Sequence, residues 1–238
     1  MNTLIVYAHP EPRSFNAALR EVAVDTLHGM GHAVVVSDLY AMGFAPVVGR
    51  ADFLTQHNPE RFNVSLEQRH AVARGGLAPD IARELARLQA ADLVILQFPL
   101  WWFGLPAILK GWIDRVFVSG VSYGRSTVFE NGKFRGKRAM VCVTTGGPAQ
   151  SFGPDALNGD ILDLLMPLHR GVLGFTGMTV LPPFTCFHVP YEGDAARRQM
   201  LQAYRSRLGE LDRLTPLPMP RTDQYPGLLV HGQRPCAQ

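Results

Sequence analysis

Short apolar runs that would be buried on both faces alternate with helical segments along most of this chain. These runs occupy residues 3–7, 33–37, 92–98, 138–144 and 178–181. Strands of this kind separated by helices predict a parallel sheet covered by helices on both sides. Five such strands fit a doubly wound α/β sheet with the strand order 2-1-3-4-5. In such a sheet, ligands bind beyond the carboxyl ends of the strands.

Segments with helical periodicity connect these runs. They cover residues 15–27, a stretch that opens at 78–80 and runs to Leu88, and residues 106–118, 159–173 and 195–211. Pro167 should kink or break the fourth of these helices, because proline has no N–H to donate. The polar stretch 38–77 is expected to be an excursion with short helices. Residues 1–213 are therefore predicted to form one domain, and the proline-rich residues 214–238 an extended tail.

Composition excludes several classes of protein. Of the 238 residues, 18% are charged and 47% apolar, which is typical of a globular chain and not of a disordered one. The net charge is only +3, and the basic cluster Lys133, Arg135, Lys137 and Arg138 is expected to be a solvated loop, so no nucleic-acid partner is predicted. Three cysteines without C-x-x-C spacing argue against a disulfide framework or a metal site. Since neither a signal peptide nor a membrane helix is recognisable, a cytoplasmic location is expected.

Three loops follow strands 1, 3 and 4, where such a sheet binds its ligand. Residues 8–16 read A-H-P-E-P-R-S-F-N and lead into a helix N-terminus, which suits a phosphate; the alternative is a plain N-cap by Ser14. Residues 98–104 read F-P-L-W-W-F-G, an aromatic cluster that suits a flat isoalloxazine ring, or else a dimer interface or core. Residues 144–147 read T-T-G-G and present backbone N–H groups to a ligand, unless they form a simple turn.

These segments resemble the NAD(P)H:quinone oxidoreductases of the DT-diaphorase type. The similarity covers residues 2–212 and includes the runs at 4–10, 14–16, 37–42, 91–94, 97–104, 106–112 and 144–147. The resemblance implies a flavodoxin-like fold and a homodimer with its active site at the subunit interface. It implies FAD, with FMN less expected, and a ping-pong two-electron reduction of a quinone or similar aromatic acceptor by NADH or NADPH.

The resemblance also implies roles for single residues in each part of the site. The FAD diphosphate would be held by His9, Phe15, Asn16 and Ala17, and the isoalloxazine platform would be formed by Leu100, Trp101, Trp102 and Phe103. Ser14, Pro99 and Phe152 are expected as further cofactor contacts. The polar edge of the flavin would meet Thr144, Thr145, Gly146 and Gly147, and Asn63, Asp114 and Arg197 would complete the cofactor site. Gly146 and Gly147, helped by Asn158, would stabilise the reduced flavin.

Two departures from the family bear on the acceptor and the proton. Phe152 and Asn158 stand where the family has a Tyr and a His that relay a proton, so this relay is absent or is replaced by water and backbone donors. Of two tyrosines that line the family's substrate pocket, Tyr123 is kept and Arg125 replaces the other. A guanidinium there would favour anionic or polar acceptors, or the donor's phosphate. A flavodoxin-type electron carrier, a regulatory subunit of a membrane transport system and a flavin-free binding module remain alternatives.

Overall fold

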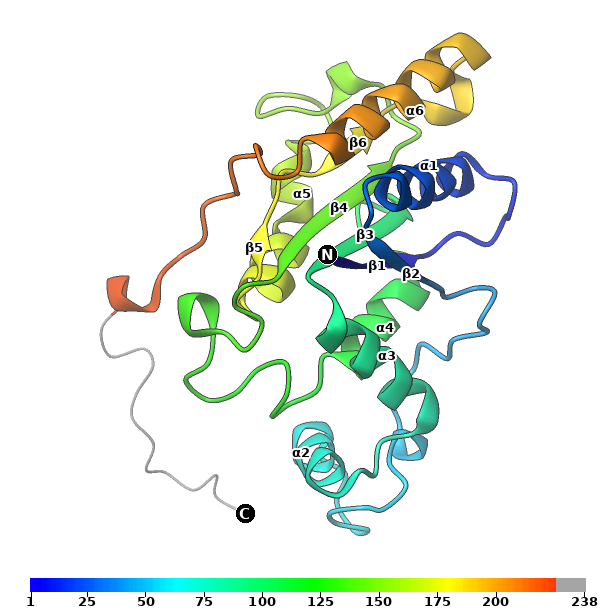
Figure 1. The fold of residues 1–238 in the computed structure, drawn as a ribbon. Helices are drawn as coiled ribbons and strands as arrows, with labels where there is room; N and C mark the ends of the chain where they lie inside the picture. Colours follow the sequence, from blue (N-terminus) through cyan, green and yellow to red (C-terminus); the bar gives the residue numbers. More distant parts are fainter. Residues whose placement is uncertain (226–238) are drawn as a thin grey trace.

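The apolar runs of the sequence form one parallel sheet in the computed structural model, which describes residues 1–225 (Figure 1). Its strands are β1 Asn2–Tyr7, β2 Ala33–Asp38, β3 Leu93–Pro99, β4 Arg138–Thr144, β5 Thr179–Val180 and β6 Phe184–Cys186. The order is β2-β1-β3-β4-β5, with β6 also paired to β4, and every pairing is parallel. The predicted strand order is thus confirmed.

The fifth position of the sheet differs from the prediction of one strand over residues 178–181. There β5 pairs with the start of β4, through Arg138 and Ala139, and β6 pairs with its end, from Cys142 onward. Pro182 and Pro183 lie between the two short strands. Because proline has no N–H for the ladder, pairing is interrupted there and the edge is made of two pieces.

Helices cover both faces of the sheet, which explains why its strands are apolar on both sides. On one face lie α1 Phe15–Gly29 and α6 Asp194–Gly209, and on the other lie α3 Pro79–Ala90, α4 Ala107–Val116 and α5 Ile161–Leu168 (Figure 1). Along β3, Val94 and Leu96 pack toward α3, α4 and α5, whereas Leu93 and Ile95 pack toward α1 and α6. Alternate residues therefore enter two separate cores.

Residues 39–78 form the predicted excursion, with a 3₁₀ turn at Arg50–Asp52 and helix α2 at Val64–Arg74. A buried arginine of α4 holds this excursion in place. The guanidinium of Arg115 donates to Asp52 at 2.9 Å, to Asp80 at 2.7 Å and to the carbonyl of Ala45 at 2.9 Å. Removing one partner of such a buried charge network costs more than an exposed ion pair would contribute.

Several boundaries depart from the sequence pattern. The helix predicted over residues 159–173 is α5 followed by a π-helical segment, His169–Gly174, with Pro167 in the last turn of α5. Proline cannot donate the next i→i−4 bond, so the α-helical pattern ends there. The solvated-loop prediction is wrong for two residues of the basic cluster. Lys137 donates to the carbonyls of Gln89 and Ala91, and Arg138 begins β4 and pairs with Asp212.

The described part of the predicted tail, residues 214–225, lies against its own chain. The amide of Leu217 donates to the carbonyl of Val180 at 2.8 Å, and Leu217 and Met219 pack on the core. The remaining turns, all 3₁₀, are η2 Phe129–Asn131, η3 Ala149–Ser151, η5 Val189–Tyr191 and η6 Thr222–Gln224. The rest of the predicted tail lies outside the described residues. Among residues 1–225 no helix is long and apolar enough to cross a membrane.

Candidate flavin site

The carboxyl ends of β1, β3 and β4 open into one cavity of about 620 Å³, a size typical of ligand pockets. Its lining comes from all three loops that the sequence singled out and from the segment after β6. The residues are His9, Arg13, Ser14, Phe15, Asn16, Ala18, Pro99, Leu100, Trp101, Thr144, Thr145, Gly146, Val189, Pro190 and Arg197. Segments far apart in the sequence therefore meet at the place that the strand order predicts.

The N-terminus of α1 forms the anion-binding end of this cavity. Ser14 is the N-cap, and its Oγ accepts the amide of Ala17 at 3.1 Å, so the N-cap prediction for Ser14 is confirmed. The amides of Phe15 and Asn16, at the first two helical positions, have no acceptor within the helix and remain available to a ligand. The first turn holds no acidic residue, and Arg13 also lines the cavity. Free amides, the helix dipole and a cation together suit a phosphate.

His9 offers a hydrogen-bond donor here rather than a full positive charge. Its Nδ1 accepts the amide of Glu11 at 3.1 Å, so the neutral ring carries its proton on Nε2. Burial lowers the pKa of His9, which keeps the ring neutral near pH 7. Its ring centroid lies 6.3 Å from that of Trp101, so the first and second loops meet at this point.

Arg197 reaches the cavity from α6. Its guanidinium donates to the carbonyl of Val189 at 3.2 and 3.3 Å and to that of Pro190 at 3.4 Å, and all three residues line the cavity. Arg197 was expected from the sequence, whereas Val189, Pro190 and Ala18 were missed. The segment 189–190 follows the fifth strand position, so the rule that ligands bind at the carboxyl ends of strands could have found it.

Asn16 gives a test of whether this cavity suits a polar cofactor. Its side chain is 2% exposed, and Nδ2 donates to Thr144 Oγ1 at 2.7 Å. Within residues 1–225 its Oδ1 has no hydrogen-bond partner, and neither has Oε1 of the neighbouring Gln97. Buried acceptors are normally satisfied, so a ligand that brings donors to Asn16 fits this wall.

The backbone at Gly146 gives a second test of whether a flavin fits this cavity. A Cβ built on Gly146 would meet nothing within 4 Å, so the space beside this backbone is open to a ligand. Across the described chain the amides of Gly146 and Gly147 donate to no acceptor. The loop itself is fixed, because Thr145 donates its amide to Cys186 and its hydroxyl to Gly147, both at 2.8 Å. Gly146 therefore lines the cavity with open space beside its backbone, as an electron-rich ring edge requires, whereas Gly147 is packed against Phe152, Ser151 and Asn158 and lies outside the lining.

The aromatic cluster after β3 forms a tight turn in a strained conformation. The amides and carbonyls of Trp101 and Gly104 exchange two hydrogen bonds of 3.2 and 3.0 Å. Between them Trp102 and Phe103 have φ of 50° and 58°, a left-handed conformation that bulky side chains rarely adopt. Trp102 is 98% exposed, and Phe103 lines a neighbouring cavity of about 320 Å³ beside α5. Only Pro99, Leu100 and Trp101 of the predicted platform line the main cavity.

Comparison with known proteins places this architecture in a family. The family model described as "Flavodoxin-like fold" matches residues 1–208. Ribosyldihydronicotinamide dehydrogenase [quinone] of Homo sapiens is 44% identical over 216 residues, covering 90% of this chain and 94% of the relative. NAD(P)H dehydrogenase [quinone] 1 of Rattus norvegicus is 42% identical over 215 residues, covering 90% and 78%. The chain belongs to the NAD(P)H dehydrogenase (quinone) family.

A solved structure agrees with this assignment. The crystal structure of a protein described as a quinone reductase, from Klebsiella pneumoniae, superposes with a TM-score of 0.89 at 40% sequence identity. The match covers 93% of this chain and 88% of that chain. The similarity therefore extends over nearly all of the described fold, and the family is one of flavin-dependent NAD(P)H oxidoreductases.

Phe152 and Asn158, the two residues expected at the positions of the proton relay, lie beside Gly147. A Cβ on Gly147 would stand 3.0 Å from the Phe152 ring, 3.2 Å from Ser151 Oγ and 3.3 Å from Asn158 Nδ2. Asn158 Nδ2 donates to Ser151 Oγ at 3.0 Å. These residues therefore pack around the glycine loop, next to the cavity but outside its lining.

Four other predicted residues lie apart from the cavity in a single chain. Asn63 caps α2, at the opposite end of the molecule from α6, and its Oδ1 accepts the amide of Leu66 (Figure 1). Asp114 pairs with Lys110 on the surface of α4. Tyr123 packs near Phe175, and Arg125 lines a different cavity; neither lines the first. The assignment of these four residues to the flavin site stays a prediction, and it requires that a second subunit bring them to the cavity. Ala17 is buried beneath the N-cap instead of lining the cavity.

Proposed function

We propose that this protein is a flavin-dependent NAD(P)H dehydrogenase that reduces quinones or similar planar aromatic acceptors by two electrons. The observation that carries this proposal is the single cavity at the carboxyl ends of β1, β3 and β4. It combines a helix N-terminus suited to phosphate, an aromatic wall suited to a flat ring, and a free backbone donor at Gly146. The 44% and 42% identities to two quinone dehydrogenases support the same activity.

FAD is the cofactor that we propose, in preference to FMN. The three loops suffice for one phosphate-bearing flavin, but the cavity continues to Val189, Pro190 and Arg197. A guanidinium held by two carbonyls at that wall suits the second, adenosine half of a dinucleotide. The amides of Phe15 and Asn16, with Arg13, would hold the diphosphate.

Bound flavin would supply the redox chemistry, since it accepts a hydride from a nicotinamide and passes two electrons to an acceptor. The chain would supply orientation and electrostatics. Gly146 and Gly147 would direct their amides at the ring edge where negative charge develops on reduction, and these donors are already oriented before the reaction. Phe152 and Asn158 cannot titrate, and Asn158 is hydrogen-bonded to Ser151, so a side-chain proton relay would be absent here. Backbone donors would stabilise the negative charge of the reduced ring, and water would supply the proton.

A homodimer with shared active sites is also part of the proposal. Tyr123 and Arg125, the predicted acceptor residues, lie outside the first cavity of their own chain. A partner subunit would have to bring its Tyr123 and Arg125 over the cavity for one site to contain both the cofactor residues and the acceptor residues. The exposed Trp102, on its strained turn at the cavity, suits a site completed by a second subunit.

The test is the visible spectrum of the protein after incubation with FAD and desalting, recorded before and after anaerobic NADPH. Flavin bands that persist through desalting and bleach on addition are expected. NADH and dihydronicotinamide riboside should be tried in parallel, since the human relative is named for the latter donor. Steady-state rates with a quinone should give parallel reciprocal plots, and intersecting plots would contradict the ping-pong mechanism. Turnover with donor and quinone alone would exclude a pure electron carrier. Bands that fail to appear would contradict the cofactor assignment.

A further inference from the structure

Helix α2 holds two other segments of the chain through two neighbouring buried side chains. Glu67 and Gln68 are 0% and 4% exposed, although both residue types usually lie on the surface. The carboxylate of Glu67 accepts the amides of His57 at 2.5 Å and Asn58 at 3.2 Å, in the excursion. Oε1 of Gln68 accepts the amide of Ser119 at 3.0 Å, in the loop that follows α4. The helix therefore fixes its own excursion with one side chain and a distant loop with the next.

The loop that follows α4 is a tight turn that leads into Tyr123. The amide of Gly120 donates to the carbonyl of Tyr123 at 2.9 Å, and Ser119 and Tyr123 form an isolated β-bridge. Gly120 has φ of 95°, in the left-handed region that glycine adopts without strain. Tyr123 is therefore fastened to the backbone of Ser119, the residue whose amide Gln68 accepts.

Support for this turn comes from α2. Ser119 is itself buried and so is its hydrogen bond to Gln68, so water is excluded from this contact. A buried amide that loses its acceptor pays the full cost of desolvation. Arg69 adds packing beside Gln68, because a Cβ on Gly120 would stand 3.6 Å from Arg69 Cγ. Two adjacent residues of α2 therefore back the turn, and Gln68 supplies the polar contact.

The same helix begins at a residue of the proposed shared site. Asn63, its N-cap, is predicted beside the flavin, and Tyr123 is predicted beside the acceptor. In the proposed homodimer both would reach the partner's cavity, because neither lines the cavity of its own chain. Gln68 lies on the helix that Asn63 caps and holds the turn that bears Tyr123, so it fixes the spacing between these two contributions.

We propose that Gln68 is a positioning residue for the acceptor, which fixes Tyr123 through the amide of Ser119 and itself touches neither flavin nor acceptor. The inference rests on the proposed function, since it concerns how the acceptor is held in the shared site. A Tyr123 ring held in one place stacks on a planar acceptor at little cost in ordering, whereas a ring on a loosened turn must be ordered at each binding event. Removing the acceptor oxygen of Gln68 should therefore weaken acceptor binding and leave the flavin cavity unchanged.

The test compares Gln68→Met with Gln68→Glu in the full chain loaded with FAD. Methionine has nearly the length of glutamine but no strong acceptor, whereas glutamate keeps an oxygen for the Ser119 amide, charged or protonated. With 1,4-naphthoquinone at saturating donor, Gln68→Met should raise KM about two- to tenfold, the size of a lost aromatic contact, and Gln68→Glu should restore it. With ferricyanide, which takes electrons without stacking on a ring, Gln68→Met should leave the rate unchanged. Rates that fall equally for both acceptors would overturn the proposal, as would an unchanged quinone KM.

A double-mutant cycle tells whether Gln68 acts through Tyr123. In Tyr123→Ala the quinone KM should rise, and adding Gln68→Met should raise it no further. Additive effects would refute the proposal. Hydrogen exchange gives a readout that needs no turnover, since the amides of Ser119 and Gly120 should exchange faster in Gln68→Met and at the unmodified rate in Gln68→Glu. Unchanged exchange in Gln68→Met would contradict the support of the turn by α2.

Leu208→Ala is the matched control for stability. Leu208 is fully buried in the core under α1 and α6, so its truncation destabilises the protein at least as much as losing the Gln68 oxygen does. Its quinone KM should match that of the unmodified protein, and a rise equal to that in Gln68→Met would reduce the effect to lost stability and overturn the proposal. An unmodified protein that reduces no quinone would refute the proposed function and this inference with it, whereas failures confined to the variants refute this inference alone.

Discussion

Replacing Trp102 by glycine should make the flavin-free protein more stable and its flavin site weaker. Trp102 is 98% exposed, so its side chain gains almost nothing from burial within its own chain. Its backbone has φ of 50°, in the left-handed region. An exposed tryptophan on an unfavourable backbone is explained if the side chain serves a ligand or a partner subunit.

The expected magnitude follows from two opposing terms. An L-residue in the left-handed region costs about 1–2 kcal/mol, which glycine does not incur. Glycine loses about 0.5–1 kcal/mol more chain entropy on folding. The free energy of unfolding should therefore rise by about 0.5–1 kcal/mol. With a urea m-value of about 3 kcal/mol/M, the midpoint moves up by about 0.2–0.3 M. Loss of an aromatic contact worth about 0.5–1.5 kcal/mol should weaken flavin binding about two- to tenfold.

Urea unfolding followed by circular dichroism measures the first effect, and FAD fluorescence titration the second. Trp102→Asn is the matched control, because asparagine tolerates the left-handed region but keeps its Cβ and carries no aromatic ring. It should show the same loss of flavin affinity with a smaller gain in stability. If Trp102→Gly unfolds at a lower urea concentration than the unmodified protein, the Trp102 side chain makes a stabilising contact. An unfolding midpoint that rises with protein concentration in the unmodified protein alone would assign this contact to a second subunit. Unchanged flavin affinity would remove Trp102 from the cofactor site.

Three further predictions concern stability. Burial lowers the pKa of His169 to about 4, against about 6.5 when unfolded, so the unfolded state binds the proton first and stability falls as the pH drops from 6.5 to 4. Denaturant titrations should show that the free energy of unfolding falls by about 3 kcal/mol over this pH range, and this fall should be absent in His169→Leu. Gly111→Ala should lower the free energy of unfolding by about 2–3 kcal/mol, because its Cβ would overlap the carbonyl oxygen of Pro46 in packed backbone; no change in the urea midpoint would contradict this. Glu130→Gln should lower the hydrogen-exchange protection factors of the amides in residues 220–225, and so should acid once the exchange rates are corrected for the intrinsic effect of pH, since hydrogen bonds from Thr222 lower the pKa of Glu130 and their effect is lost as the pH falls.

The cavity was largely predictable because its three loops lie at strand ends. Ser14, Gly146 and Trp101 each belong to a segment whose place follows from the order of the strands, and all three line the cavity. Val189 and Pro190 were not found. They follow β6, which ends at Cys186, whereas the sequence predicts that the fifth strand ends at residue 181, so the loop after it was expected in the wrong place.

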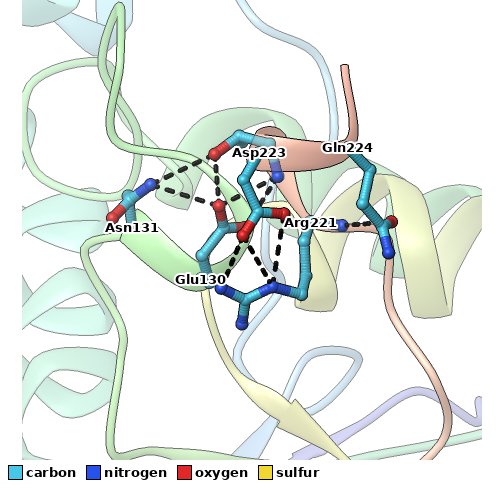
Figure 2. Close-up of polar contacts among 6 residues, drawn as sticks. Glu130, Asn131, Arg221, Asp223 and Gln224 are labelled. Carbon is cyan, nitrogen blue, oxygen red and sulfur yellow. Dashed lines mark hydrogen bonds and ion pairs between the residues drawn. The ribbon is translucent and has the colours of Figure 1, made fainter. Parts of the chain in front are cut away.

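A second cavity lies beside the π-helical segment and could not be predicted from any local pattern. Arg170 and Arg221 are far apart in the sequence and sit in no recognisable motif, and residues 220–225 read as part of a proline-rich tail. Hydrogen bonds from Thr222 to Glu130 and from Asn131 to Thr222 bring residues 220–225 back over η2 (Figure 2). Such contacts depend on where two distant backbones run, and no window of sequence contains both.

The class of fold, the strand order and the anion-binding turn before α1 all follow from the order of residues along the chain. These features depend on local chemistry: alternate side chains of a strand enter opposite cores, a serine caps a helix, and prolines interrupt a ladder. Folding in three dimensions settles how β5 and β6 share one edge, where Arg197 is held and which arginines meet around a second cavity. These arrangements depend on packing between helices and strands. A long-range contact forms only when two distant segments meet, so neither segment of the sequence predicts it alone.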